Sequence, residues 1–122
     1  MKLRIRGNSI RIRLSQTETA DLGEDRLLHE QTKFPRGNSL DFQLTTGEDF
    51  GISFKEETIL ITVPKETVRK WTHSEELSLS HDFPLPNEDN LWLLVEKDLS
   101  CKTDRPREDD SDAFPNTSTT NC

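Results

Sequence analysis

The amino-acid sequence predicts an α+β protein, mainly of antiparallel β-structure. We expect a bent sheet or partly open barrel with two short helices and an acidic C-terminal tail. Residues 2–14 alternate between apolar and basic side chains around a Gly-Asn pair, and further strand-like runs follow as far as residue 97. The periodicity stops after Asp98. We therefore expect a single β-rich domain over residues 1–99 and a flexible or docked acidic tail over residues 100–122.

Residues 2–14 predict a β-hairpin with one apolar and one basic face. Gly7 is the first residue of a two-residue loop, where a type II′ turn needs a positive φ. The register that follows makes these pairs: Arg6 with Ser9, Ile5 with Ile10, Arg4 with Arg11, Leu3 with Ile12, and Lys2 with Arg13. Apolar residues then meet apolar residues, and the basic residues share the other face.

The basic face admits two interpretations. Like charges opposite each other, such as Arg4 and Arg11, destabilise a sheet unless an anion or an acidic residue intervenes. Short charge patterns are common on exposed sheets, so a solvated face, with an acidic residue of the next strand between the arginines, is one interpretation. The other is an anion site for phosphate or carboxylate. The candidate anion-binding residues are Arg4, Arg6, Arg11 and Arg13.

The next segment predicts a short helix and a second hairpin. Ser15 and Glu18 have the spacing of a capping box, and Gly23 ends the helix that they begin. A strand is expected over residues 26–34, part of which pairs with residues 40–45. Residues 36–39 repeat the letters RGNS of residues 6–9, which indicates either an internal duplication of the hairpin or a chance identity.

The middle and end of the predicted domain contain two more hairpins and a helix. Residues 52–55 and 58–63 form a hairpin across two glutamates, and Pro64 precedes a helix over residues 65–72. Another strand begins near Leu77, and residues 91–95 form the strand that follows it after a turn. Because residues 91–95 are all apolar, we expect a central strand that is buried on both faces.

Composition and charge restrict the function classes. The 122 residues suffice for one domain, and a hydrophobic content of 30% against a charged content of 32% implies that part of the chain is unpacked. The net charge of −7 argues against nucleic acid or an anionic membrane as the main partner. No apolar run has membrane-spanning length, and the first strand follows Met1 too closely for a signal peptide, so we expect a cytoplasmic protein.

Metal or cofactor chemistry receives little support. Cys101 and Cys122, with a histidine and Asp109 or Asp112, offer zinc-ligand chemistry, but the spacing matches no common zinc motif. We expect free thiols, no cofactor and, as a minor alternative, weak metal binding through the tail. The sequence has no glycine-rich phosphate loop.

Both ends of the chain resemble one family. The run KLRIRGNSIRIRL of residues 2–14 and the motifs EKDLSC of residues 96–101 and EDDSDAFPN of residues 108–116 resemble a family of short, uncharacterised bacterial proteins, a domain of unknown function. Leu99 stands where an aromatic residue is expected. The resemblance implies a bacterial, cytoplasmic protein and no particular activity. It marks a set of tail residues as candidates: Cys101, Asp109, Asp112, Phe114 and Asn116.

The sequence favours a small binding or interaction module whose basic hairpin face takes an anionic partner or the chain's own acidic tail. In the second case, the tail would neutralise Arg4, Arg11 and Arg13. The alternative from another class is an enzyme that handles phosphate or polyphosphate, with the arginines lining a barrel pocket. An enzyme requires a concave pocket with carboxylates beside the arginines, whereas a module presents them on an open surface.

Overall fold

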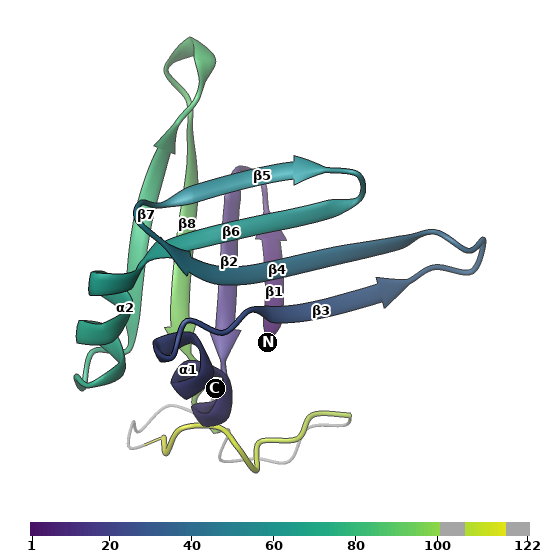
Figure 1. The fold of residues 1–122 in the computed structure, drawn as a ribbon. Helices are drawn as coiled ribbons and strands as arrows, with labels where there is room; N and C mark the ends of the chain where they lie inside the picture. The colour runs from purple at the N-terminus through teal and green to yellow at the C-terminus, as the bar shows by residue number, and fades with distance from the viewer. Residues whose placement is uncertain (101–106, 117–122) are drawn as a thin grey trace. The chain divides into compact units, whose positions relative to one another are not determined.

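The computed structural model describes residues 1–100 and 107–116, and within them two α-helices and two four-stranded sheets (Figure 1). The elements are, in order, β1 (Lys2–Arg6), β2 (Ser9–Leu14), α1 (Gln16–Gly23), β3 (Leu28–Lys33), β4 (Ser39–Gly47), β5 (Gly51–Lys55), β6 (Thr58–Pro64), α2 (Lys65–Thr72), β7 (Ser78–Pro84), the short 3-10 helix η1 (Pro86–Glu88) and β8 (Asn90–Lys97). The chain divides into two compact units, one made of residues 2–19 and those from 76 onward, the other of Met1 and residues 20–75.

Each unit contains one sheet. The first sheet has the order β1-β2-β8-β7, and the second has the order β3-β4-β6-β5. In each sheet two antiparallel hairpins meet at a central parallel pair, β2 with β8 and β4 with β6. The predicted α+β class is confirmed. The strands form two mixed sheets, and neither closes into a barrel.

The first hairpin has the predicted register at all five pairs, from Lys2 with Arg13 to Arg6 with Ser9. Gly7 has a φ of 54°, the sign that the predicted turn requires. The inward residues Ile10, Ile12 and Leu14 of β2 are buried. The alternation of the sequence therefore predicted the pairing and the buried face of β2, whereas Ile5 on the same face of β1 is 54% exposed.

The two helices begin as the sequence indicates. In α1 the backbone N–H of Glu18 donates to Ser15 Oγ at 3.2 Å, and the N–H of Ser15 donates to Glu18 Oε1 at 3.0 Å, which completes the capping box. The helix α2 follows Pro64 and buries Val68 and Trp71. Gly23, at the end of α1, lies so close to Thr72 that a Cβ would come within 3.3 Å of its side chain.

The repeated RGNS letters do not occupy equivalent positions. In the first hairpin Arg6 pairs with Ser9 across a two-residue turn. In the second hairpin Ser39 pairs with Lys33, and Arg36 lies in the connecting loop. The hairpin formed by β3 and β4 is as expected, but the letter identity does not reflect a repeated structure.

A different repeat relates the two halves of the chain. Each half runs hairpin, helix, hairpin: β1, β2, α1, β3 and β4 in the first, and β5, β6, α2, β7 and β8 in the second. Each strand of one half can be matched with its counterpart in the other half, β1 with β5, β2 with β6, β3 with β7 and β4 with β8. Exchanging every strand for its counterpart turns the order of the first sheet, β1-β2-β8-β7, into β5-β6-β4-β3, which is the order of the second sheet written from its other edge. Each sheet thus joins the leading hairpin of one half to the closing hairpin of the other.

The match extends to individual residues. Ile10, Ile12 and Leu14 correspond to Ile59, Ile61 and Val63, and Thr19 and Leu22 of α1 correspond to Val68 and Trp71 of α2; all ten are buried. Across the central parallel pairs, Ile10 faces Leu93 as Ile59 faces Phe42, and Ile12 faces Val95 as Ile61 faces Leu44. The two halves are therefore structural repeats of one ββαββ unit, alike in register and burial.

The expectation for residues 91–95 was wrong in one respect. Leu93, Leu94 and Val95 are buried, and β8 is central in the first sheet, as predicted. Trp92, however, is 40% exposed. It lies near the start of β8, paired with the small residue Ser9.

Candidate anion-binding site

The four candidate arginines lie on the outer face of the first sheet. Alternate residues of β1 and β2 point away from the core, so that Arg4 and Arg6 are exposed and Arg11 and Arg13 are half-buried. Ser9 and Trp92 are paired neighbours on this face. We call this surface the basic face and define it by these residues: Arg4, Arg6, Ser9, Arg11, Arg13 and Trp92.

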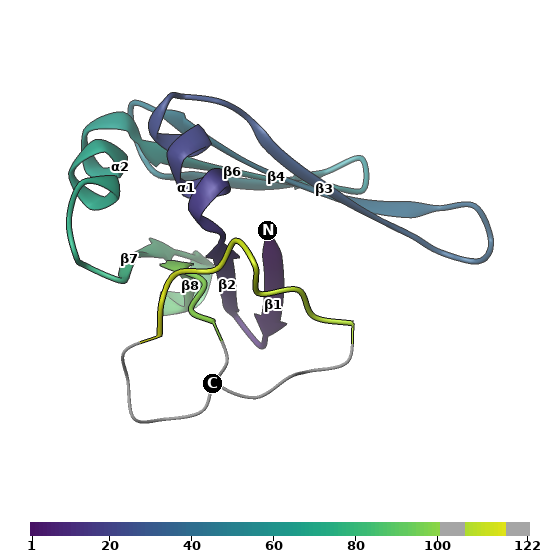
Figure 2. The same ribbon diagram turned by 90° about the horizontal axis from the view of Figure 1, so that it is seen from below.

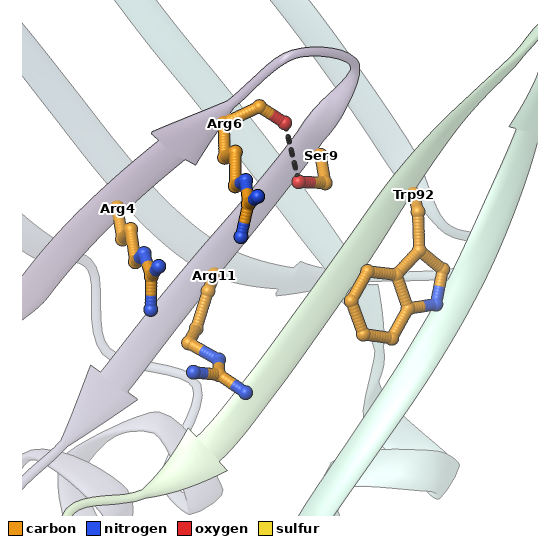
Figure 3. Close-up of a pocket in the computed structure, with 5 residues that line it drawn as sticks. All are labelled: Arg4, Arg6, Ser9, Arg11 and Trp92. Carbon is orange, nitrogen blue, oxygen red and sulfur yellow. Dashed lines mark hydrogen bonds between the residues drawn. The ribbon is translucent and has the colours of Figure 1, made fainter.

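The basic face contains a depression of about 340 Å³ lined by Arg4, Arg6, Ser9, Arg11 and Trp92. Figure 3 shows the three guanidinium groups on the β1–β2 side and the indole on β8, with all four side chains on the same side of the sheet. Ser9 Oγ donates to the carbonyl of Arg6 at 2.6 Å, so its hydroxyl supports the hairpin turn. A smaller depression of about 100 Å³ adjoins Arg4, Arg11 and Arg13.

One carboxylate of the neighbouring strand serves two arginines. Glu96 Oε1 lies 2.7 Å from Arg13 Nε and 3.2 Å from Arg11 Nε. It is the intervening acidic residue that one interpretation of the sequence anticipated. Within residues 1–100 and 107–116, no carboxylate lies within ion-pairing distance of Arg4 or Arg6. The positive charge of the face is therefore only partly compensated.

Lys2 extends the basic residues of β1 but is occupied by the chain itself. Its Nζ lies 2.8 Å from Asp98 Oδ2 and 3.0 Å from Glu108 Oε2. Burial by itself would lower the pKa of Lys2, but the hydrogen bonds and charges of Asp98 and Glu108 outweigh it and raise that pKa. Lys2 therefore anchors the tail.

The described part of the tail contacts the first sheet and the start of α1 (Figure 2). Phe114 forms a parallel bridge with Leu99, and the Lys97 ammonium lies 5.6 Å from the centre of its ring. The N–H of Thr17 donates to Asp112 Oδ2 at 3.2 Å. Hydrogen bonds from Ser15 and then Thr17 lower the pKa of Asp112.

Of the remaining tail candidates, Asp109 and Asn116 lie among the described residues. Asp109 is exposed and accepts a hydrogen bond from the N–H of Ser111 at 2.9 Å; the backbone and side chain of Ser111 lower its pKa. Asn116 is half-buried. Cys101 and Cys122 lie outside the described residues.

Neither a metal-ligating cluster nor a membrane-spanning helix occurs in the described part of the chain. No group of three or more His, Cys, Asp and Glu side chains is placed to hold a metal ion there. No described helix combines the length and the apolar character needed to cross a membrane.

Sequence reasoning missed one residue of the basic face, Trp92, and also the glutamate that pairs with its arginines. Trp92 was assigned to the core because it stands in an unbroken apolar run. Only the parallel pairing of β2 with β8 brings Glu96 opposite Arg13. Because no short turn connects the two strands of a parallel pair, the residues near either strand do not predict the register between them.

The fold and the face define a small α+β protein of two mixed sheets, one of which presents an open, partly compensated basic surface. The chain belongs to the family of unknown function DUF7009, whose model matches residues 1–118, and this confirms the resemblance drawn from the two end motifs. No curated protein and no solved structure matches the chain.

Proposed function

We propose that the protein is a binding module that uses the basic face to hold a polyanionic partner. The observation that carries the proposal is the internal repeat, since the second sheet has the same outer positions without the arginines. Arg4, Arg6, Arg11 and Arg13 correspond to Ser53, Lys55, Leu60 and Thr62. The repeated fold therefore forms without arginine at these positions.

The arginines also act against the stability of the hairpin. Arg4 lies directly opposite Arg11, and like charges in this position cost about 0.2–1 kcal/mol. The equivalent pair, Ser53 and Leu60, carries no charge. A cost of this kind is offset when an anion bridges the two guanidinium groups, because each offers a planar fork of N–H donors to phosphate or carboxylate.

The shape of the face favours binding over catalysis. The arginines lie on an open sheet surface, and the sheet does not close around them. Glu96 is engaged by Arg11 and Arg13, whereas no carboxylate in the described part of the chain pairs with Arg4 or Arg6. A long anion that crosses β1 and β2 can contact several guanidinium groups at once. A cytoplasmic location in a bacterial cell belongs to this proposal, because polyanions are abundant there.

Inorganic polyphosphate is a suitable first probe, because it offers charge without aromatic or peptide groups. We expect binding at 50 mM salt that weakens as salt rises. The double variant Arg4→Ser, Arg6→Ser should bind at least about tenfold more weakly, since each charge-assisted hydrogen bond contributes about 1.5–3 kcal/mol in a favourable geometry.

The repeat supplies a matched control. Lys33→Ser, Lys55→Ser removes the same charge from the equivalent face of the second sheet and should leave the affinity within about twofold of the wild type. Equal losses in both double variants would show that net charge, and not the basic face, governs binding. Absence of any binding by the wild type would overturn the proposed function.

A further inference from the structure

The geometry points to single-stranded nucleic acid as the polyanion, held by phosphate contacts to the arginines and by stacking of a base on Trp92. This inference rests on the proposed function and adds a ligand class to it. Trp92 lines the same depression as Arg4, Arg6 and Arg11, and among the described residues it is the only aromatic one that does. Phosphates and flat rings together are the groups that this surface matches.

The exposure of Trp92 is not a requirement of the fold. The equivalent position in the second sheet is Asp41, which pairs with Thr58 as Trp92 pairs with Ser9. A polar residue thus serves the repeated structure, whereas the first sheet leaves a large indole 40% exposed. Figure 3 shows the indole on the sheet surface beside Arg11 and Ser9, where a flat ligand group could lie against it.

Charge divides the surface into two parts. The arginines come from β1 and β2, and Trp92 stands between Ser9 of β2 and Asp82 of β7. Asp82 disfavours a phosphate on the β7 side of the indole, and Glu96 compensates the end of the face near Arg13. Phosphates are therefore expected over Arg4, Arg6 and Arg11, with a base over Trp92.

A single strand fits this division better than a duplex. In a duplex the bases stack on one another inside the helix, so a ring on a sheet surface cannot reach their faces. In a single strand each base has a free π-face, and stacking on an aromatic side chain is tolerant of sequence. An acidic peptide satisfies the arginines but has no need of an exposed indole.

The net charge of −7 argues against nucleic acid for the chain taken as a whole, but the charge is unevenly distributed. The acidic run of residues 108–112 lies in the tail, and its Glu108 and Asp112 bind Lys2 and Thr17. The basic face itself has four arginines, and in the described part of the chain Glu96 is the one carboxylate paired with any of them. Local charge, not the total, determines whether a phosphate backbone can approach this surface.

The test measures binding of a labelled dodecamer of deoxythymidine by fluorescence anisotropy. Binding of unlabelled polyphosphate and poly-glutamate is measured in parallel by titration calorimetry. Trp92→Ala should weaken binding to the oligonucleotide by about 5- to 150-fold, the loss of one stacked base, and leave polyphosphate binding unchanged. Trp92→Phe should recover much of the affinity. Arg4→Ser, Arg6→Ser should lower the slope of log K against log salt by about 1.4.

Phe54→Ala is the matched control, because Phe54 is an exposed aromatic residue of the second sheet and its loss should not change binding. If Trp92→Ala leaves the affinity for the oligonucleotide unchanged, the stacking inference is overturned. Binding of polyphosphate without the oligonucleotide, or stronger binding of poly-glutamate, overturns the nucleic-acid inference and leaves the proposed function standing. No binding of any polyanion overturns both.

Discussion

Replacing Arg4 should separate the stability of the first sheet from its binding function. Arg4 faces Arg11 across the hairpin and has no ion-pairing carboxylate among the described residues. Opposed residues have Cβ atoms about 4.5–5.5 Å apart, and two unit charges about 4 Å apart in water repel by about 1 kcal/mol. The variant Arg4→Thr removes that repulsion and introduces a residue that favours strands. We therefore expect its free energy of unfolding to rise by about 0.2–1 kcal/mol while polyanion binding weakens.

Urea denaturation at low and high salt measures this effect. At 10 mM salt the Debye length is about 30 Å, so the repulsion is nearly unscreened, whereas at 1 M salt it is about 3 Å and the gain should disappear. Arg6→Thr is the matched control, because Arg6 faces the uncharged Ser9. It should weaken binding without the gain in stability. If Arg4→Thr loses more than about 0.5 kcal/mol at either salt concentration, the side chain supports the fold and the reasoning is refuted.

Three other outcomes follow from the contacts. Glu57→Gly should stabilise the protein by about 1 kcal/mol in thermal unfolding, because Glu57 adopts a φ of 62° that costs a side chain energy, and no gain would contradict that strain. Glu96→Gln should tighten polyphosphate binding severalfold in titration calorimetry, since it frees Arg11 and Arg13; weaker binding would show that Glu96 positions them. The pKa of Asp112 is lowered in the folded state, so its contribution to holding the tail is complete above about pH 3.8 and is lost as the pH falls further. Limited proteolysis of the tail should detect this loss. The variant Asp112→Asn should remove the pH dependence.

The sequence was informative wherever structure is local. Alternating residues and Gly7 predicted the first hairpin with its register, and the capping box predicted the start of α1. Pro64 and the spacing of Val68 and Trp71 predicted α2. In each case the signal lies within a few residues, because turns, caps and helix faces are determined by near neighbours.

Long-range pairing was beyond the reach of these patterns. The separation into two sheets depends on the parallel pairs of β2 with β8 and β4 with β6, which join strands far apart in the chain. The ββαββ repeat is visible as a pattern of buried positions, although few letters are shared. The RGNS identity, which is visible as letters, has no structural counterpart.

The candidate site was predictable only in part, because some of its residues depend on local pairing and others on long-range pairing. The shared face of the arginines follows from the hairpin, and the structure places them together. Trp92 and Glu96 join that face only through the parallel pairing with β8. An unbroken apolar run does not reveal which of its members stays exposed.

The most direct test of the basic face is an NMR titration that follows the Nε–Hε signals of the arginine side chains as polyphosphate is added. Binding at the face predicts large shifts at Arg4, Arg6 and Arg11, with little change at Arg36 in the loop of the second hairpin. Shifts of equal size at Arg36, or none at Arg4 and Arg6, would contradict the assignment of the first sheet as the binding surface.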